Sequence, residues 1–272
     1  MTIMQSIILG IVQGITEFLP VSSSAHLVLV PFFLGWDIPI EQAFPFDVLV
    51  QIGTLFSVVV YFRRDLVEII TTFFSGLKRS TPFEDHRSRL GWYIILATIP
   101  AGIAGLLLKS RIEAAFNSPL ITGLFLFGTA AILVLAEFIG KRSRTLPFLK
   151  WQDALWIGLA QAVAIFPGIS RSGATISGGL LRNLQRPAAA RFSFLMSIPI
   201  MLAAGIVSLK DLSQVPNIIT FLPILFIGFL TAALVGYVAI HWLLQFITKR
   251  SLYFFALYCA ALGLITIMKV YV

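Results

Sequence analysis

The hydrophobic positions of this chain form long runs that are separated by short polar connections. Six of the runs are uninterrupted, and each is long enough to cross about 30 Å of hydrocarbon as a helix. They cover roughly residues 46–62, 91–108, 118–139, 189–209, 218–246 and 252–270. The pattern therefore predicts an all-α, polytopic membrane helix bundle with six spanning helices.

Two further apolar runs, at about 2–35 and 152–182, are each interrupted by a polar turn. The first polar turn is P-V-S-S-S at 20–24, and the second is P-G-I-S-R-S at 167–172. Unpaired backbone groups in such a turn would each cost several kcal/mol against lipid, so the turn must line a protein-walled or wet cavity. We therefore interpret both runs as re-entrant helical hairpins.

The two interrupted runs also belong to an internal repeat. At a constant offset of 148 residues, and without a gap, Gly10, Gln13, Phe18, Ser22 and Ser24 align with Gly158, Gln161, Phe166, Ser170 and Ser172. A hairpin followed by three spans occurs twice, and three spans change sides, so the second copy should be inverted. We expect a single membrane domain over 1–272, with one repeat at about 1–140 and the other at about 151–272.

Composition agrees with a membrane protein. Only 12% of the 272 residues are charged and 58% are hydrophobic, with a mean hydropathy of +0.94, whereas soluble domains carry about 25% charged residues. The net charge of +8 does not indicate a nucleic-acid partner, because the basic residues lie in connections between apolar runs. The single cysteine, Cys259, excludes an internal disulfide.

Basic residues also predict how the chain is oriented. The proposed layout places 15 on one face and 4 on the other, with Arg171 set aside in the second polar turn. The first set is Arg63, Arg64, Lys78, Arg79, Arg87, Arg89, Lys141, Arg142, Arg144, Lys150, Arg182, Arg186, Arg191, Lys249 and Arg250, and the second is Lys109, Arg111, Lys210 and Lys269. The richer face should be cytoplasmic. Both termini are then outside, and the two polar turns meet near mid-membrane.

Polar residues around the first turn are candidates for catalysis. Gln13 and Glu17 are four residues apart and share one helix face, and a carboxylate inside an apolar run is usually functional. His26 follows the serines of the turn closely. The alternatives are a Glu17 that only fixes packing and a His26 that only forms structural hydrogen bonds. Asp47, at the outer start of a span, and Gln51, one turn later, are candidates for supporting the site.

Arg171 is the most informative residue of the second turn. It lies between Ser170 and Ser172, and a guanidinium in this setting needs an anionic partner. Arginine binds phosphate bidentately, and the helices expected after both turns would add N-terminal N–H groups. The alternative is a salt bridge to Glu17 that only locks the hairpins together. One bridge would not explain the hydroxyls and histidine gathered nearby, so we favour an anion site.

These two segments resemble the signatures of a known family. Residues 13–26, Q-G-I-T-E-F-L-P-V-S-S-S-A-H, resemble the first signature of the bacterial undecaprenyl-diphosphate phosphatases of the bacitracin-resistance type. Residues 167–175, P-G-I-S-R-S-G-A-T, resemble the second, and the similarity runs essentially end to end. The first signature allows Gln or Glu at Gln13, so Glu17 is the carboxylate that carries over. Arg186-Pro187 departs from the family pattern, in which an acidic residue often follows the arginine.

The resemblance implies hydrolysis of the terminal phosphate of a C55 polyprenyl diphosphate, which returns the lipid carrier for cell-wall synthesis and confers bacitracin resistance. It implies a multi-pass protein of the bacterial plasma membrane, an active site that opens to the outer side, and a divalent cation, Mg²⁺ or Ca²⁺, with Glu17 as its candidate ligand. The site implied by resemblance contains Glu17, Ser23, His26, Ser170, Arg171 and Thr175. The residue pattern adds Ser172 for phosphate binding and Gln13, Ser22, Ser24, Asp47 and Gln51 as supporting residues.

Several alternatives stay open. The nucleophile is Ser23 activated by His26 or Glu17, His26 itself, or a water molecule. The acid-phosphatase-like lipid phosphatases are disfavoured, because the first histidine after Arg171 is His241, far along the chain. A transporter or flippase would explain the inverted repeat and an anion site, but not the Ser-His-Glu group. The expected partners are the lipid substrate and the bilayer, with a homodimer left open.

Overall fold

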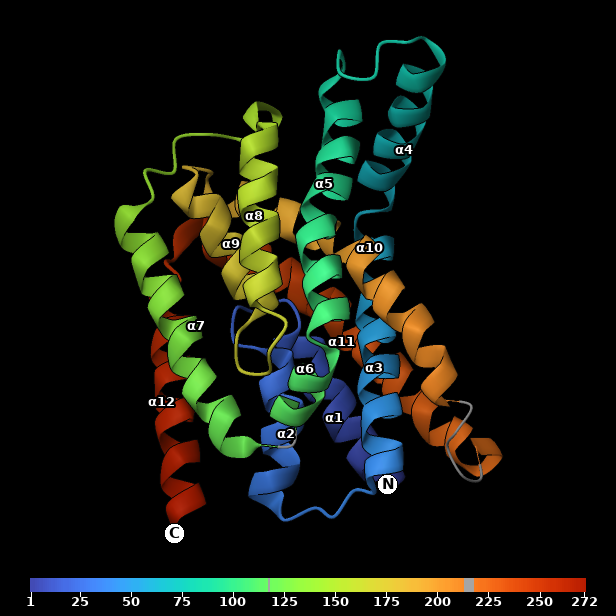
Figure 1. Ribbon diagram of the computed structural model, residues 1–272, viewed down its shortest axis with the longest axis vertical. Helices are drawn as coiled ribbons and strands as arrows, with labels where there is room; N and C mark the ends of the chain where they lie inside the picture. The colour runs from blue at the N-terminus through green and yellow to red at the C-terminus, as the bar shows by residue number, and fades with distance from the viewer. Residues whose placement is uncertain (117, 213–217) are drawn as a thin grey trace.

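A computed structural model describes residues 1–116, 118–212 and 218–272. Over these residues the regular secondary structure is α-helical, apart from a short 3₁₀ helix (Leu146–Phe148) and one isolated β-bridge between Arg144 and Leu184. The helices form an upright bundle, and both termini lie at the same end of it (Figure 1). The predicted all-α fold class is therefore confirmed.

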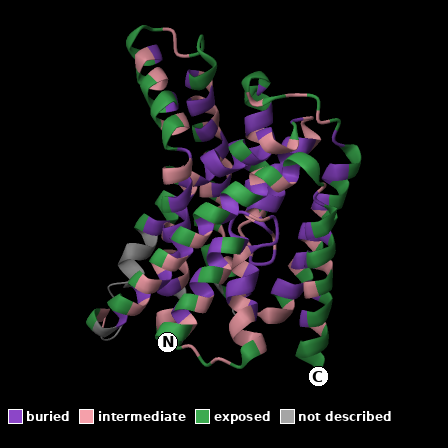
Figure 2. Cartoon of the chain, turned by 180° about the vertical axis from the view of Figure 1, so that it is seen from behind, coloured by how far each residue is buried: buried purple, intermediate pink, exposed green. Residues whose placement is uncertain are grey.

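Within the described residues, six helices are long and apolar enough to cross a membrane. They are α3 (Ile40–Tyr61), α5 (His86–Leu107), α7 (Pro119–Ile139), α10 (Arg186–Leu212), α11 (Ile218–Lys249) and α12 (Tyr253–Tyr271). They coincide with the six apolar runs of the sequence. Large apolar residues such as Leu106, Phe138 and Leu257 are exposed, and exposed positions run along the outer faces of the helices (Figure 2), as expected for a surface in contact with lipid rather than water. The protein is therefore a multi-pass membrane protein.

Each interrupted run folds as two short helices joined by its polar turn. The first run gives α1 (Ile3–Thr16) and α2 (Ser23–Leu34), and the second gives α8 (Trp151–Val163) and α9 (Arg171–Leu181). The members of each pair pack together. Both turns lie at mid-height in the bundle, with α1 and α2 toward the end of the termini and α8 and α9 toward the other end (Figure 1). Re-entry of these helices into a membrane stays a prediction.

Helix pairing follows a reciprocal pattern. Helix α1 packs along α11, and α8 packs along α5; α3 contacts α11, and α10 contacts α5. The two halves can be matched helix by helix: α1, α2, α3, α5 and α7 correspond in order to α8, α9, α10, α11 and α12. Under this matching, the α1–α11 contact corresponds to the α8–α5 contact, and the α3–α11 contact corresponds to the α10–α5 contact. The pairing agrees with the predicted inverted repeat, although the repeat itself and its boundaries stay predictions.

Two helices lie outside the predicted elements. Helix α4 (Arg63–Lys78) follows α3 after a break at Phe62 and packs on α5, with which it projects beyond the rest of the bundle (Figure 1). Helix α6 (Lys109–Phe116) is short and follows α5. Both contain too many charged residues to form an apolar run, so a search for spanning segments passes over them. Such amphipathic helices can be recognised in a sequence only by apolar residues that recur with the 3.6-residue period of a helix.

Two buried carboxylates join the helix ends opposite the termini. Glu137 of α7 accepts hydrogen bonds from the Arg186 guanidinium at 2.7 and 2.6 Å and from the Leu252 backbone N–H at 2.8 Å. Asp153 of α8 accepts from Arg144 and Arg182, both at 2.7 Å. Since these carboxylates are paired, they need no catalytic explanation.

Candidate active site

The two polar turns are hydrogen-bonded to each other. Ser22 Oγ accepts a hydrogen bond from the Gly168 backbone N–H at 3.1 Å, and Ser172 Oγ donates to the Leu19 carbonyl at 2.9 Å. Each turn thus uses a serine to satisfy a backbone group of the other. Because backbone groups at this depth have little access to water, the reciprocal bonds explain how two irregular segments remain stable inside the bundle.

The same segments start the helices that follow. Ser22 caps α2, and Ser170 caps α9, where its Oγ accepts from the backbone N–H three residues later at 3.0 Å. Thr129 of α7 braces the second turn, since its Oγ donates to the Gly168 carbonyl at 2.7 Å and accepts from the Ser170 N–H at 2.8 Å. Two helix N-termini, each a favourable end for an anion, therefore begin at the middle of the molecule.

A pocket of about 280 Å³ opens beside the turns. Its walls come from both halves of the chain, and its apolar side includes Ala101 of α5, Phe116 of α6 and Met201 of α10. The polar residues that line it are Glu17, Ser22, Ser23, Ser24, Gln51, Gln161 and Arg171. The structure thus brings together residues that are about 150 positions apart in the sequence.

Glu17 lies at the centre of the polar contacts. Its Oε2 accepts from Ser23 Oγ at 2.5 Å and from Gln13 Nε2 at 2.8 Å, while its Oε1 pairs with the Arg171 guanidinium. Gln13 Nε2 also lies 3.4 Å from Thr54 Oγ. A hydroxyl held against a carboxylate is the arrangement that activates a nucleophile.

Arg171 occupies the first position of α9 and faces the pocket. Its salt bridge to Glu17 joins the two turns, and the two side chains are largely buried, 18% and 6% exposed. From the sequence alone, the bridge and an anion site are alternatives. The geometry is compatible with both, since the same guanidinium pairs with Glu17 and lines the pocket.

His26 lies beside the pocket rather than in its wall. Its Nδ1 is 2.7 Å from the Ser22 carbonyl oxygen, and its Nε2 is 2.7 Å from the Tyr258 hydroxyl of α12. A carbonyl can only accept, so Nδ1 carries the proton and Nε2 of the neutral ring accepts from Tyr258. Both nitrogens therefore bond to groups other than the Ser23 hydroxyl, and a direct part for His26 in catalysis stays a prediction.

Of the remaining predicted residues, some line the pocket and others form hydrogen bonds next to the second turn. Gln51 lines the pocket, but Asp47 is absent from its lining. Ser170 Oγ and Ser172 Oγ lie 3.1 Å apart behind the second turn. Thr175 Oγ is 2.8 Å from the Arg171 carbonyl and 2.6 Å from Ser193 Oγ, so it holds the start of α9 against α10.

Among the polar residues that line the pocket, one was not a predicted site residue. Gln161 of α8 lines the pocket and is buried. The sequence held a signal for it, because Gln161 aligns with Gln13 at the repeat offset of 148. Supporting residues such as Thr129 and Tyr258 carried no such signal, since their roles depend on how α7 and α12 pack against the turns.

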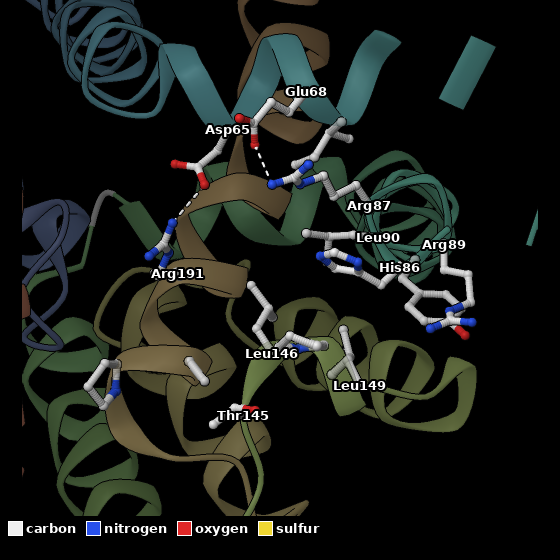
Figure 3. Close-up of a pocket in the computed structure, with 15 residues that line it drawn as sticks. Asp65, Glu68, His86, Arg87, Arg89, Leu90, Thr145, Leu146, Leu149 and Arg191 are labelled. Atoms are coloured by element: carbon white, nitrogen blue, oxygen red, sulfur yellow. Dashed lines mark hydrogen bonds and ion pairs between the residues drawn. The ribbon is translucent and has the colours of Figure 1, made fainter. Parts of the chain in front are cut away.

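A second pocket, of about 350 Å³, lies between the α4–α5 hairpin, residues 145–149 and the start of α10 (Figure 3). Four of its charged groups form two ion pairs: Arg191 with Asp65 at 2.7 Å and Arg87 with Glu68 at 3.1 Å (Figure 3). It contains none of the predicted site residues. The pocket at the polar turns is therefore the candidate active site.

Six apolar helices that enclose a serine, a carboxylate and an arginine define an integral membrane protein equipped to act on an anionic group. Comparison with known proteins gives the family. The family model described as "Bacitracin resistance protein BacA" matches residues 6–265, and the chain belongs to that family.

Curated relatives cover nearly the whole chain. The "Undecaprenyl-diphosphatase" of Methanobrevibacter smithii is 44% identical over 98% of this chain and 98% of its own length. The protein of the same name from Chlorobium phaeobacteroides is 45% identical over 97% of this chain and 95% of its own. That of Myxococcus xanthus is 41% identical over 98% and 89%. The resemblance inferred from the two signatures is confirmed.

Proposed function

We propose that this protein is an undecaprenyl-diphosphatase, which hydrolyses the lipid diphosphate to undecaprenyl phosphate and inorganic phosphate. The observation that carries the proposal is the contact of Ser23, Glu17 and Arg171 in one pocket inside a membrane bundle. Membership of the family and the names of its relatives agree with it. The reaction returns the lipid carrier to cell-wall synthesis and accounts for bacitracin resistance.

Substrate binding uses the charge and the apolar wall of the pocket. The Arg171 guanidinium binds the diphosphate bidentately, and the N-termini of α2 and α9 direct their dipoles toward it. Apolar residues of α5, α6 and α10 contact the first prenyl units. When Arg171 turns to the diphosphate, it releases Glu17 Oε1, so the resting salt bridge also holds the carboxylate in place before substrate arrives.

Ser23 is the proposed nucleophile. Its Oγ attacks the terminal phosphorus as its proton passes to Glu17 Oε2, only 2.5 Å away. The bond between that phosphorus and the bridging oxygen breaks, and the bridging oxygen leaves on the lipid monophosphate. Glu17 passes this proton on to the departing monophosphate oxygen. The carboxylate then takes a proton from a water molecule, which attacks the phosphoserine, and it returns that proton to Ser23 Oγ as inorganic phosphate leaves. Arg171 neutralises charge on the phosphoryl oxygens throughout.

His26 acts as a positioning residue in this mechanism. Its hydrogen bond to the Ser22 carbonyl, anchored by Tyr258, fixes the backbone immediately before Ser23. The ring therefore determines where the Ser23 hydroxyl lies relative to Glu17, without touching the reacting atoms.

A divalent cation fits this site only as a partner of the substrate. The described residues contain no group of three or more His, Cys, Asp or Glu side chains that could hold a metal ion, and Glu17 is the one carboxylate among the described lining residues. Magnesium is commonly bound by one or two carboxylates together with substrate phosphates. Glu17 would supply the protein ligand, and a bound cation would further neutralise the diphosphate.

The active site is proposed to open toward the outer side of the bacterial plasma membrane. This rests on the charge asymmetry of the sequence. It also rests on the placement of the charged α4–α5 connection at the end of the bundle opposite to the termini (Figure 1). The homodimer stays a prediction, which crosslinking in native membranes would test.

The test of the proposed function is phosphate release from a polyprenyl diphosphate by purified protein. We expect Ser23→Ala to lower turnover by about 10³-fold or more, and brief incubation of the wild type with terminally labelled substrate to leave label on Ser23. Ser24→Ala is the matched control, because the Ser24 hydroxyl contacts Ser22 Oγ rather than Glu17; its loss should be far smaller. Normal turnover by Ser23→Ala would assign the attack to water or His26.

A further inference from the structure

Gln161 is a buried amide without a hydrogen-bond partner. Gln161 is 2% exposed, and neither its Nε2 nor its Oε1 has a hydrogen-bond partner among the residues that the structure describes. A buried amide that leaves both donor and acceptor unpaired is unfavourable, and such groups in native proteins are few. Gln161 nevertheless lines the pocket that contains Glu17, Ser23 and Arg171.

The aligned residue of the first half shows what is different at Gln161. Gln13 donates through Nε2 to Glu17 Oε2 at 2.8 Å, four residues later on the same helix face. The residue four positions after Gln161 is Ile165, which also lines the pocket. The second half thus keeps the amide but has an isoleucine in place of the acid. Gln13 Oε1 is unpaired too, but Gln13 lies outside the pocket lining.

We propose that Gln161 is a further substrate-binding residue of this site and contacts the diphosphate directly. Its Nε2 donates to an oxygen of the terminal phosphoryl group, which offers acceptors only. Its Oε1 accepts from the water molecule that cleaves the phosphoserine, as glutamine side chains orient attacking water in other phosphoryl-transfer enzymes. The substrate and this water supply the two partners that Gln161 lacks among the described residues. This inference rests on the proposed function of the site.

Other buried unpaired groups provide matched controls. Ser177 Oγ of α9 and Thr122 Oγ of α7 are buried and without a partner among the described residues, but neither residue lines the pocket. If an unpaired polar atom were only an imperfection of packing, Gln161, Ser177 and Thr122 would respond alike to replacement by an apolar residue. A ligand-binding role predicts that only Gln161 affects turnover.

The experiment compares wild type, Gln161→Leu, Ser177→Ala and Thr122→Val in hydrolysis of a short polyprenyl diphosphate, with thermal unfolding of each protein. We expect Gln161→Leu to lower kcat/KM by about 10- to 100-fold, the scale of one hydrogen bond to a charged group. It should melt at or above the wild-type temperature, because it removes an unpaired buried amide. The two controls should keep wild-type kcat/KM.

Two further measurements separate binding from packing. Inorganic pyrophosphate should raise the melting temperature of the wild type and raise that of Gln161→Leu much less. Gln161→Glu keeps one acceptor but presents an anion to the diphosphate, so it should raise KM more than Gln161→Leu does. Gln161→Met, an unbranched apolar replacement, should reproduce the loss seen with leucine.

The proposal is overturned if Gln161→Leu has wild-type kcat/KM and the full response to pyrophosphate. It is also overturned if the leucine and methionine variants both melt well below wild type, since the amide would then be part of the packing. Failure of the wild type to release phosphate from the lipid would instead contradict the proposed function. In that case the pyrophosphate response would still decide whether Gln161 binds the anion.

Discussion

At the scale of residues, the central feature is one ion pair that serves two purposes. Arg171 and Glu17 bridge the two polar turns, and both line the pocket. A buried pair loses the hydration of both charges, so it contributes less to stability than its short contact suggests. Removal of one partner would leave the other charge buried and unpaired. A substitution that keeps the charge but changes its geometry therefore separates catalysis from stability.

Arg171→Lys should keep the fold and lose most of the activity. Lysine supplies a positive charge to Glu17 but not the planar fork that binds phosphate bidentately. We expect turnover to fall on the order of 10²-fold, as for loss of one transition-state charge partner. KM should change less, since charge on the phosphoryl oxygens rises as the bond breaks. Steady-state hydrolysis and thermal unfolding measure these effects.

Arg191→Lys is the matched control for this substitution. Arg191 forms a half-exposed pair with Asp65 in the second pocket, and exposed pairs contribute little. It should leave turnover close to wild type. The account of the site would be wrong if Arg171→Lys melted much earlier than wild type and yet turned over normally per folded molecule.

At the scale of elements, glycines position the helices that carry the turns. Gly10 of α1 lies against α11, where a Cβ would come within 2.8 Å of the Gly228 carbonyl oxygen. Its repeat partner Gly158 of α8 lies against α5 in the same way. Close contact through small residues is a common way for membrane helices to pack. The depth of each turn therefore depends on a glycine contact several residues before it.

Gly158→Ala should destabilise the protein. The added Cβ would lie 2.6 Å from the Ala97 carbonyl oxygen, and the backbone of α5 cannot move aside cheaply. We expect a loss of about 1–3 kcal/mol, as for overpacking of a core, measured as lower thermal stability in detergent. Gly102→Ala on α5 is the control, since a Cβ there has no neighbour within 4 Å and alanine favours the helix. Equal melting of the two variants would contradict this role for Gly158.

At the scale of the whole molecule, the two ends of the bundle differ in chemistry. The charged α4–α5 connection, the end of α7 and the start of α8 lie away from the termini (Figure 1). The last turn of α7 carries Glu137 and the first turn of α8 carries Asp153, each paired with arginines. The positive-inside rule predicts that this end is cytoplasmic. The side chain of Lys210, one of the four basic residues assigned to the other face, lies outside the described part of the structure.

A cysteine at Ser80, between α4 and α5, should test this orientation. In intact cells, Ser80→Cys should resist a membrane-impermeant thiol reagent, whereas Val272→Cys at the exposed C-terminus should react. The native Cys259 is buried, so it should contribute little background. After the cells are opened, Ser80→Cys should react as well. Labelling of Ser80→Cys before lysis would reverse the proposed topology.

The sequence by itself determined the fold class and where the chain is interrupted. Run length predicts the six spanning helices, since each must cross the hydrocarbon. The polar turns are just as visible, because polar groups at that depth stand out against their apolar surroundings. The amphipathic α4 escaped this search, since its charged residues break the apolar run. Both family signatures include the turns, so the sequence locates the candidate site. It does not show which side chains of the site contact each other.

Only the tertiary structure decided which side chains meet. Glu17 and Ser23 are close in sequence, yet their contact with Arg171 depends on how two distant hairpins pack. His26 sits near the serines in the sequence, but its ring binds Tyr258 of the last helix. Gln161 lines the pocket without a partner among the described residues, and Ile165 stands where the first half has Glu17 to accept from Gln13. Local pattern fixes which segments are helical and which are polar. Contacts between segments depend on packing across the whole bundle, which no local pattern encodes.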